Sequence, residues 1–163
     1  MNDFLEKISS YNLFNYLFPG VVFCLIVDKY FSYSLIQEDV VVGVFLYYFV
    51  GLIISRVGSI IIEPTLKIIG FVKFAEYKNF IVAAKNDPKI ELLSETNNMY
   101  RTIVSLFVLI GGVAIFEALK TKWTFLNTYA IEIIVVAIIF MFLMAYRKQT
   151  NYIYKRIEAN KDD

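Results

Sequence analysis

Three ionisable residues interrupt long apolar stretches, and they are the strongest candidates in this chain for a functional role. A helix needs ~20 residues to cross the hydrocarbon of a bilayer, and three uncharged runs fall short of that length. The runs are residues 40–55, 102–116 and 133–146. Spanning helices there must take in Arg56, Glu117 and Glu132 respectively. A charge inside a membrane is costly and marks a functional candidate by default.

Arg56 also has an interpretation without a function. It lies six residues before Ile62, roughly 9 Å from the expected end of its span. An arginine side chain can snorkel that far to reach water, and a structural ion pair would satisfy the guanidinium equally well. The sequence leaves these interpretations open beside the functional one.

Glu117 and Glu132 could form carboxylate rings near the outer mouth of a pore built from several copies of the chain. Glu132 lies about 8 Å below the outer surface when ~20 residues are counted back from the basic pair Arg147 and Lys148. Rings of acidic side chains attract cations. The competing interpretation is an interfacial position for both carboxylates. The neighbours of Glu132 at helical spacing are apolar, so a water-filled lumen would need another lining.

The first apolar stretch offers that lining. Asn12, Asn15 and Tyr16 share one broad helical face with Pro19. Pro19-Gly20 is expected to interrupt the helix within the membrane and to free backbone groups that neighbouring helices or water must satisfy. Such a kink can act as a gate hinge. Alternatively, the asparagines hold helices together and the kink is static.

Small residues mark surfaces for close helix packing. In the second apolar stretch they recur at multiples of four, and in the third they form an adjacent pair. They are Gly43, Gly51, Ser55 and Ser59, and then Gly111 and Gly112. Such surfaces let helix backbones approach closely. They suit a bundle within one chain and an association between chains equally well.

Composition argues against several classes of function. Histidine is absent and Cys24 is the single cysteine, which removes the commonest general base, the commonest metal ligand and any intrachain disulfide. No P-loop, dinucleotide-binding glycine motif, nucleophile elbow or zinc spacing occurs. The net charge of +1 gives no reason to expect direct binding of nucleic acid. We therefore expect a protein that is not an enzyme and has no cofactor or metal site.

Four apolar stretches predict an all-α polytopic membrane protein whose immediate partner is the lipid bilayer. Of 163 residues, 58% are hydrophobic and 19% charged, which is more apolar surface than one small soluble core hides. The expected transmembrane helices cover residues 13–27, 40–62, 102–119 and 127–146. The chain thus divides into 1–62 with spans 1 and 2 and an amphipathic start, a cytoplasmic helical segment 63–101, spans 3 and 4 in 102–146, and a basic tail 147–163.

Basic residues set the expected orientation. Lysine and arginine are retained on the cytoplasmic side of a membrane, and here they concentrate in residues 63–101 and 147–163. Both termini and the central segment are therefore expected in the cytoplasm, with the protein spanning the bacterial inner membrane.

The central segment, residues 63–101, is expected to fold as helix. Apolar residues recur at near-helical spacing in its first half. Glu63-Pro64 suits a helix start, and Asp87-Pro88 suits a break before a second helical piece. An interfacial helix and a cytoplasmic extension of span 2 both fit this pattern. The candidates for docking a partner are the lysines on one side of the first piece, Lys67, Lys78 and Lys85.

Residues 11–20, Tyr-Asn-Leu-Phe-Asn-Tyr-Leu-Phe-Pro-Gly, resemble the opening of small four-span membrane proteins of bacterial phage-defence systems. In size and layout the chain is similar to the membrane effector of the Hailong system and, less closely, to the membrane subunit of Kiwa. The Hailong resemblance implies a homo-oligomeric ion channel, with a tetramer as the expected state, that is coupled to a cytoplasmic nucleotidyltransferase and depolarises the infected cell. The Kiwa resemblance implies a membrane sensor that controls a cytoplasmic DNA-binding partner.

The sequence thus favours an oligomeric ion channel or pore-forming effector of antiviral defence and abortive infection, controlled by a cytoplasmic regulatory protein. The alternative is a non-conducting membrane sensor or scaffold that docks a cytoplasmic defence protein through residues 63–101.

Overall fold

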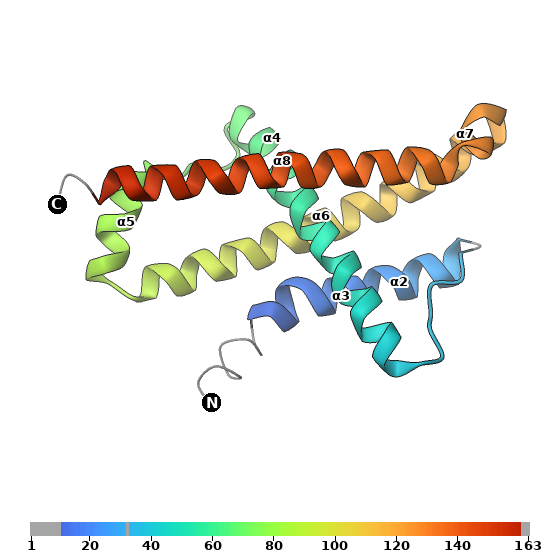
Figure 1. The fold of residues 1–163 in the computed structure, drawn as a ribbon, viewed down its shortest axis with the longest axis horizontal. Coiled ribbons are helices and arrows are strands. Elements are labelled where there is room, and N and C mark those ends of the chain that lie inside the picture. The colour runs from blue at the N-terminus through green and yellow to red at the C-terminus, as the bar shows by residue number, and fades with distance from the viewer. Residues whose placement is uncertain (1–10, 32, 161–163) are drawn as a thin grey trace.

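The computed structural model describes residues 11–31 and 33–160, and these fold as helices joined by short connections (Figure 1). The expected amphipathic start, residues 1–10, lies outside the described residues. The elements in chain order are η1 (Leu13–Leu17), α2 (Phe18–Tyr30), α3 (Val40–Val57), η2 (Gly58–Ile62), α4 (Glu63–Ile68), α5 (Tyr77–Asn86), α6 (Lys89–Lys122), α7 (Thr124–Thr128) and α8 (Ala130–Ala159), where η marks a π-helix.

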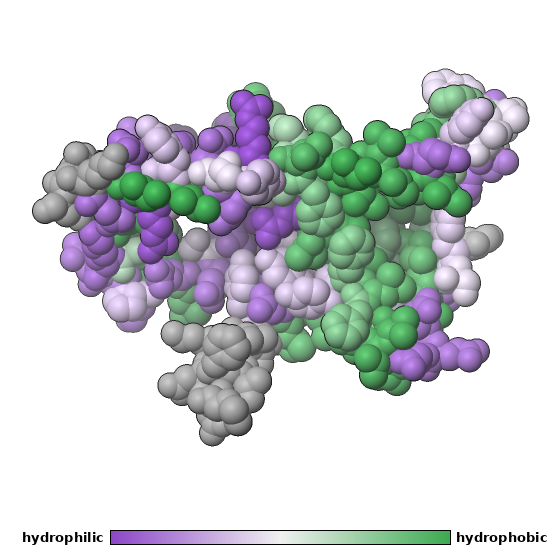
Figure 2. All heavy atoms as spheres, in the orientation of Figure 1, coloured by the Kyte–Doolittle hydropathy of each residue, from purple (hydrophilic) through white to green (hydrophobic). Residues whose placement is uncertain are grey.

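Four continuous helical runs are long and apolar enough to cross a membrane. They are Leu13–Tyr30, Val40–Ile68, Lys89–Lys122 and Ala130–Ala159. The prediction of an all-α protein with four spans is therefore confirmed, and the chain is a membrane protein. Apolar side chains cover one half of the face seen in Figure 2, and polar ones gather at the end that holds α5.

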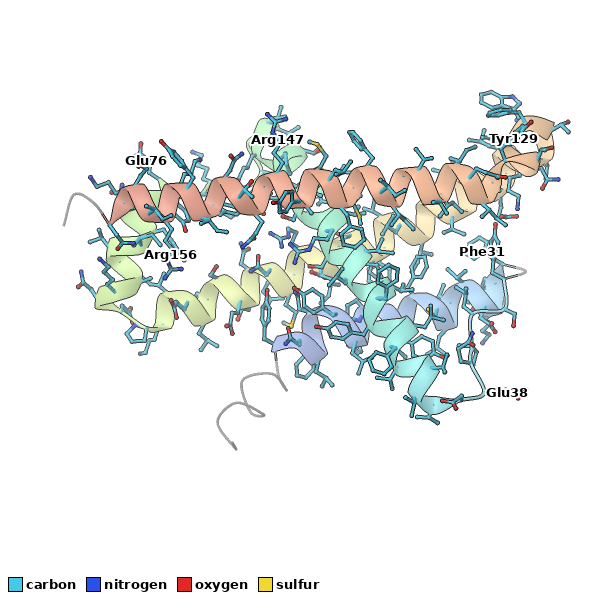
Figure 3. The ribbon with its side chains drawn as sticks, viewed as in Figure 1. Phe31, Glu38, Glu76, Tyr129, Arg147 and Arg156 are labelled. Atoms are coloured by element: carbon cyan, nitrogen blue, oxygen red, sulfur yellow. The ribbon has the colours of Figure 1, made fainter. Side chains whose placement is uncertain are left out.

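The two ends of the bundle carry different parts of the chain. Figure 3 labels Glu76 and Arg156 at one end, here called the α5 end, and Phe31 and Tyr129 at the other, here called the α7 end. Each span runs between these ends, and the described parts of the chain begin and finish toward the α5 end (Figure 1).

Two spans continue beyond the boundaries that the sequence predicts. Helix α6 is one helix of 34 residues, about 50 Å long, so no break separates residues 63–101 from span 3. Likewise α3, η2 and α4 form one helical run from residue 40 to residue 68. No proline lies between residues 89 and 122 to stop α6. The predicted break at Asp87-Pro88 does separate α5 from α6.

Helix α4 ends earlier than apolar periodicity predicts, because a glycine stops it. Gly70 has φ of 74°, the left-handed conformation that glycine adopts without steric cost. Its amide donates to the Lys67 carbonyl (3.0 Å), and the Phe71 amide donates to the Leu66 carbonyl (2.9 Å), which is the Schellman arrangement of a helix end. Residues 71–76 are not helical, so the central segment is not the continuous helix that was expected there.

The expected interruption at Pro19-Gly20 is wrong, because the backbone stays helical from residue 11 to residue 30. A π-helical turn, η1, directly precedes α2, which has Pro19 in its first turn. Proline lacks an amide hydrogen and its ring clashes with the carbonyl four residues earlier, here that of Asn15 within the wider π turn. The same device recurs at η2, which precedes Pro64 at the start of α4.

Spans 1 and 2 cross at two glycines. A Cβ added to Gly20 would overlap the Tyr47 carbonyl oxygen, and one added to Gly51 would overlap the Tyr16 carbonyl oxygen. The backbones of α2 and α3 therefore touch without side chains between them, as small-residue packing in membranes allows. Only glycine fits at these two positions.

The buried residues belong mainly to spans 1 to 3. Pro19, Cys24, Ile54 and Leu106 are less than 2% exposed. In α8 the single residue classed as buried is Met141. Span 4 therefore lies at the periphery of the bundle and presents most of its apolar side chains outward.

Candidate functional site: a basic pocket at the α5 end

A cluster of three buried polar side chains joins spans 1, 2 and 3. Asn15, Ser55 and Thr102 are 1%, 3% and 0% exposed. The Thr102 hydroxyl donates to Asn15 Oδ1 (2.8 Å), and Asn15 Nδ2 donates to Ser55 Oγ (3.5 Å). Each side chain comes from a different helix, so the cluster ties the three spans together. Asn15 thus makes an interhelical contact, which is one of the two roles that the sequence left open for it.

The cluster extends toward the α5 end through Tyr11. Its hydroxyl oxygen accepts hydrogen bonds from Asn15 Nδ2 (3.3 Å) and Asn98 Nδ2 (3.4 Å). Burial raises the pKa of the Tyr11 hydroxyl, and the nearby Tyr16 adds to the rise. Tyr11 thus remains a neutral hydroxyl whose proton is available to a further acceptor.

A second cluster surrounds the carboxylate of Glu63, which is 7% exposed. Glu63 pairs with Lys67 on its own helix (3.2 Å), with Arg101 of α6 and with Lys148 of α8 (3.3 Å). The Lys148 ammonium also donates to the Ser59 carbonyl (2.6 Å) and hydroxyl (2.8 Å). One carboxylate therefore joins spans 2, 3 and 4, and the cations around it outnumber it.

The two clusters border a pocket of about 530 Å³. Its charged lining consists of Arg56, Lys67, Arg101, Lys155 and the single carboxylate Glu63. Aromatic side chains complete much of the wall, among them Tyr16, Tyr77 and Tyr152. The pocket is therefore basic, with rings beside its charges.

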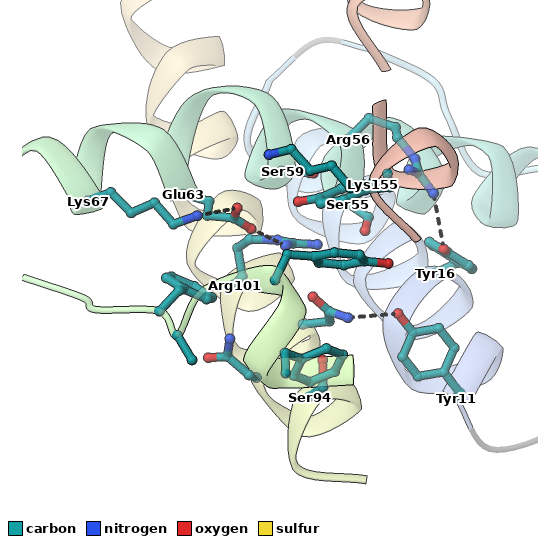
Figure 4. A pocket seen from close by; sticks show the side chains of 17 residues that line it. Tyr11, Tyr16, Ser55, Arg56, Ser59, Glu63, Lys67, Ser94, Arg101 and Lys155 are labelled. Atoms are coloured by element: carbon teal, nitrogen blue, oxygen red, sulfur yellow. Dashed lines mark hydrogen bonds and ion pairs between the residues drawn. The ribbon is translucent and has the colours of Figure 1, made fainter. Parts of the chain in front are cut away.

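Figure 4 shows that Arg56 lies apart from the Glu63 ion cluster within this pocket. Glu63 with Lys67 and Arg101 lies toward one side of the view, and Arg56 with Tyr16 toward the other. Arg56 Nη2 donates to the Tyr16 hydroxyl at 3.4 Å, and among the described residues no carboxylate lies within ion-pair distance of Arg56. The Arg101 Nε is buried and has no hydrogen-bond partner among the described residues.

Glu117 and Glu132, the expected carboxylate rings, both lie at the α7 end but in different surroundings. The Tyr33 hydroxyl donates to the Glu117 carboxylate, and Lys120 contacts both groups at 3.2 and 3.1 Å. Burial raises the pKa of Tyr33, and the hydrogen bond to Glu117 raises it further. Glu132 is exposed in the first turn of α8, where a helix N-terminus favours negative charge.

The glycines expected to pack helices fall into two groups. A Cβ on Gly58, adjacent to the predicted stripe, would overlap Ser105 Oγ of α6, and one on Gly51 would overlap the backbone of η1 at Tyr16. The atoms nearest a Cβ on Gly43 belong to the Tyr47 ring on its own helix, whereas a Cβ on Gly111 or Gly112 would meet nothing within 4 Å. The α6 pair therefore packs against no described part of its own chain.

The three lysines expected on one helical face do not share one. Lys67 lies on α4, where it pairs with Glu63 and stands 4.1 Å from the centre of the Phe74 ring. Lys78 and Lys85 lie on α5, beyond the non-helical residues 71–76. Lys78 lines a separate hollow near the end of α8, and Lys85 lines a third. Gly70 separates Lys67 from the other two.

Sequence reasoning assigned no site role to Glu63, Arg101 or Lys148, although these form the ionic centre of the site. The sequence does hold a signal for them. Each is the charged residue at the α5 end of a different span, and Glu63 is the only acid among residues 40–75. Three charges at matching depths on three spans predict an ion cluster.

Comparison with known proteins finds no relative, since no family model matches the sequence and neither a curated protein nor a solved structure is significantly similar to the chain.

Proposed function

We propose that this chain is an oligomeric protein of the bacterial inner membrane that conducts ions in antiviral defence under the control of a cytoplasmic protein. Both termini and the α5 end face the cytoplasm in this proposal, as the distribution of basic residues favours. One observation carries the control part of the proposal. Helices α6 and α8 continue unbroken from the apolar half of the bundle into the α5 end.

Continuous helices make a mechanical connection between the two parts. Helix α6 has 34 residues and α8 has 30, about 50 and 45 Å at 1.5 Å per residue, against ~30 Å of hydrocarbon. Helix α5 lies against both, and its Tyr77 ring is 5.8 Å from the Tyr152 ring of α8. A protein that displaces α5 would therefore tilt spans 3 and 4.

The pore in this proposal lies between copies of the chain. The polar side chains inside one chain bond to one another, as the cluster of Asn15, Ser55 and Thr102 illustrates. The outward faces of α6 and α8 carry Gly111, Gly112 and the exposed Glu132. A small-residue pair and a charge on otherwise apolar faces favour contact with further copies. The tetramer and the nucleotidyltransferase partner rest on the family resemblance.

Ion flux through reconstituted protein tests the proposal. The purified full chain in planar bilayers should give discrete cation-selective currents, and Glu132→Gln should lower the ratio of cation to anion permeability. Glu158→Gln, an equal charge change in the basic tail, should leave that ratio unchanged. Absence of current at both polarities, with and without the cytoplasmic partner encoded beside the chain, would show that it is not a channel.

A non-conducting sensor or scaffold is the second candidate, and the α5 end favours it. At the end of span 2 and just after it, Ile68, Ile69 and Phe71 are 85%, 67% and 77% exposed. Lys78 and Lys85 follow on α5. Apolar side chains beside basic ones suit a protein interface. If Lys78→Glu with Lys85→Glu abolishes co-purification of the partner while no variant ever conducts, the scaffold function holds and the channel function fails.

A further inference from the structure

The basic pocket at the α5 end is built for an anion, and nothing in the described chain supplies one beyond Glu63. Four cationic side chains and one carboxylate line it, a net of three positive charges. Like charges gathered in one partly enclosed space repel each other, and their repulsion grows as water is displaced. A bound anion relieves that repulsion, so the pocket gains more from an anionic ligand than from water.

The hydrogen-bond donors of the pocket fit a tetrahedral oxyanion. The Arg56 guanidinium contacts only the Tyr16 hydroxyl in the described residues, and at 3.4 Å that contact is long. Arginine presents a planar fork of donors that matches phosphate oxygens, and charge-assisted bonds of this kind are the stronger ones. The Tyr11 and Tyr16 hydroxyls each accept a hydrogen bond from a neighbour and so keep their own proton for the ligand.

The position of the pocket along the membrane normal indicates which molecule would supply the phosphate. Tyr16, Ser55 and Arg56 belong to the spans, whereas Tyr77 and Lys155 lie in the parts that extend beyond them. The pocket therefore crosses the boundary between the apolar and polar halves of the molecule (Figure 2). Phospholipid phosphates occupy this layer of a bilayer, and basic pockets between transmembrane helices bind anionic head groups.

We propose that this pocket binds the phosphate of an anionic phospholipid, held by Arg56 and Lys155 with the Tyr11 and Tyr16 hydroxyls. The Glu63 carboxylate does not oppose the ligand, because Lys67, Arg101 and Lys148 already neutralise it and it lies away from Arg56 in Figure 4. The bound head group joins α3 and α8, which carry Arg56 and Lys155. This site is independent of whether the chain conducts.

Binding to the purified full chain in detergent micelles tests this site. We expect a short-chain phosphatidylglycerol to bind at least about tenfold more tightly than the phosphatidylcholine of equal chain length. Arg56→Gln combined with Lys155→Gln should weaken phosphatidylglycerol binding by at least about tenfold, because each cation contributes a separate charge-assisted contact. Arg56→Lys should lose less than Arg56→Gln.

Arg147→Gln is the matched control. Arg147 is exposed on α8 next to Lys148, and it lines none of the three pockets. We expect the Arg147→Gln variant to bind phosphatidylglycerol within about twofold of the wild-type affinity, since general surface attraction is shared among many charges. An equal loss in Arg147→Gln and in the pocket variants would overturn the proposal, as would equal binding of the two lipids.

Competition by a soluble phosphate tests whether the phosphate in the pocket belongs to a lipid or to a soluble molecule. Glycerol 3-phosphate should compete with phosphatidylglycerol but bind more weakly, because it lacks the acyl chains that the spans would contact. If it binds as tightly as the lipid, the lipid is not the ligand and the pocket takes a soluble phosphate instead. Lys155→Gln is an exposed change that should not disturb folding, so its binding result can be interpreted even if an Arg56 variant misfolds.

Discussion

Polar groups at the α5 end bond across helices, whereas those at the α7 end bond mostly to their near neighbours. At the α5 end Glu63 alone connects α4, α6 and α8. At the α7 end Asp28 accepts from the Leu35 amide (2.9 Å) and Asp39 accepts from the first amides of α3. The contact between Tyr33 and Glu117 reaches from the first loop to α6, but among the described residues no side-chain hydrogen bond or ion pair joins α8 to another span there.

The spans also differ in how firmly they are held within the bundle. Spans 1 to 3 share a polar cluster, two glycine contacts and most buried residues. Span 4 is held at the α5 end by Lys148 and leaves a long apolar face uncovered toward the α7 end. A bundle secured at one end can change its helix spacing at the other at low cost. Such an arrangement suits a device in which a cytoplasmic event alters the spans.

The largest effect is expected where one carboxylate neutralises several cations. Glu63→Gln leaves the partly buried cations Arg101 and Lys148 without their counter-charge, and breaking a buried ion cluster costs about 3–5 kcal/mol. Unfolding in mixed micelles with increasing SDS should show this loss in the free energy of unfolding. Glu132→Gln, an exposed carboxylate at the α7 end, should change it by less than about 0.5 kcal/mol. Similar losses in both variants would erase the contrast between the ends.

The crossing of spans 1 and 2 should be the next most sensitive. Gly51→Ala places a methyl group against the Tyr16 carbonyl, and overpacking of this kind costs about 1–3 kcal/mol because the helices must move apart. The same unfolding measurement applies. Gly111→Ala is the matched control, since its Cβ meets nothing within 4 Å, and it should be neutral or slightly stabilising. A tolerated alanine at residue 51 would mean that η1 and α3 do not approach as closely as they do here.

The buried hydroxyl of Thr102 should contribute a smaller amount. Thr102→Val keeps the side-chain shape but removes the donor to Asn15, and interhelical hydrogen bonds in membranes are worth about 0.6 kcal/mol on average, up to ~1.7. Thr121→Val is the comparison, because the Thr121 hydroxyl is exposed and bonds only to the Ala118 carbonyl of its own helix (2.7 Å). We expect about 1 kcal/mol of destabilisation for Thr102→Val and almost none for Thr121→Val.

The sequence predicted the spans well because hydropathy and length depend on local composition. It predicted the break at Asp87-Pro88 for the same reason. The predicted interruption at Pro19 was wrong, because a π turn relieves the proline clash without stopping the helix. Composition does not show whether a chain meets a proline with a π turn or with a break. The sequence also placed Lys67 and Lys78 on one face, because the apolar periodicity outweighed the single glycine at residue 70.

The site was harder to predict, since it depends on which spans are neighbours. Asn15, Ser55 and Arg56 stood out as polar residues in apolar stretches, but their partners lie 40 or more positions away in the chain. The sequence could not show that Thr102, which begins the uncharged run of span 3, meets Asn15. Nor could it show that Arg56 faces a pocket and not lipid, because that depends on the rotation of α3 about its own axis.

The smallest effect on folding, and the sharpest test of the uncovered face, is expected at Gly111 and Gly112. Both are exposed on α6 with open space beside them. Replacing both with leucine raises the helix propensity of α6. Apart from that gain, the free energy of unfolding of a single chain should change by less than about 0.5 kcal/mol.

The same double variant tests whether copies of the chain pack at this small surface. If they do, the leucines will separate the backbones, and cross-linking in native membranes should shift from oligomers toward monomers. Gly43→Ala provides the control, because the atoms nearest its Cβ belong to the Tyr47 ring of its own helix, and it should leave the oligomer intact. An unchanged distribution in the leucine variant would assign this face to lipid, and the pore between copies would then need a different interface.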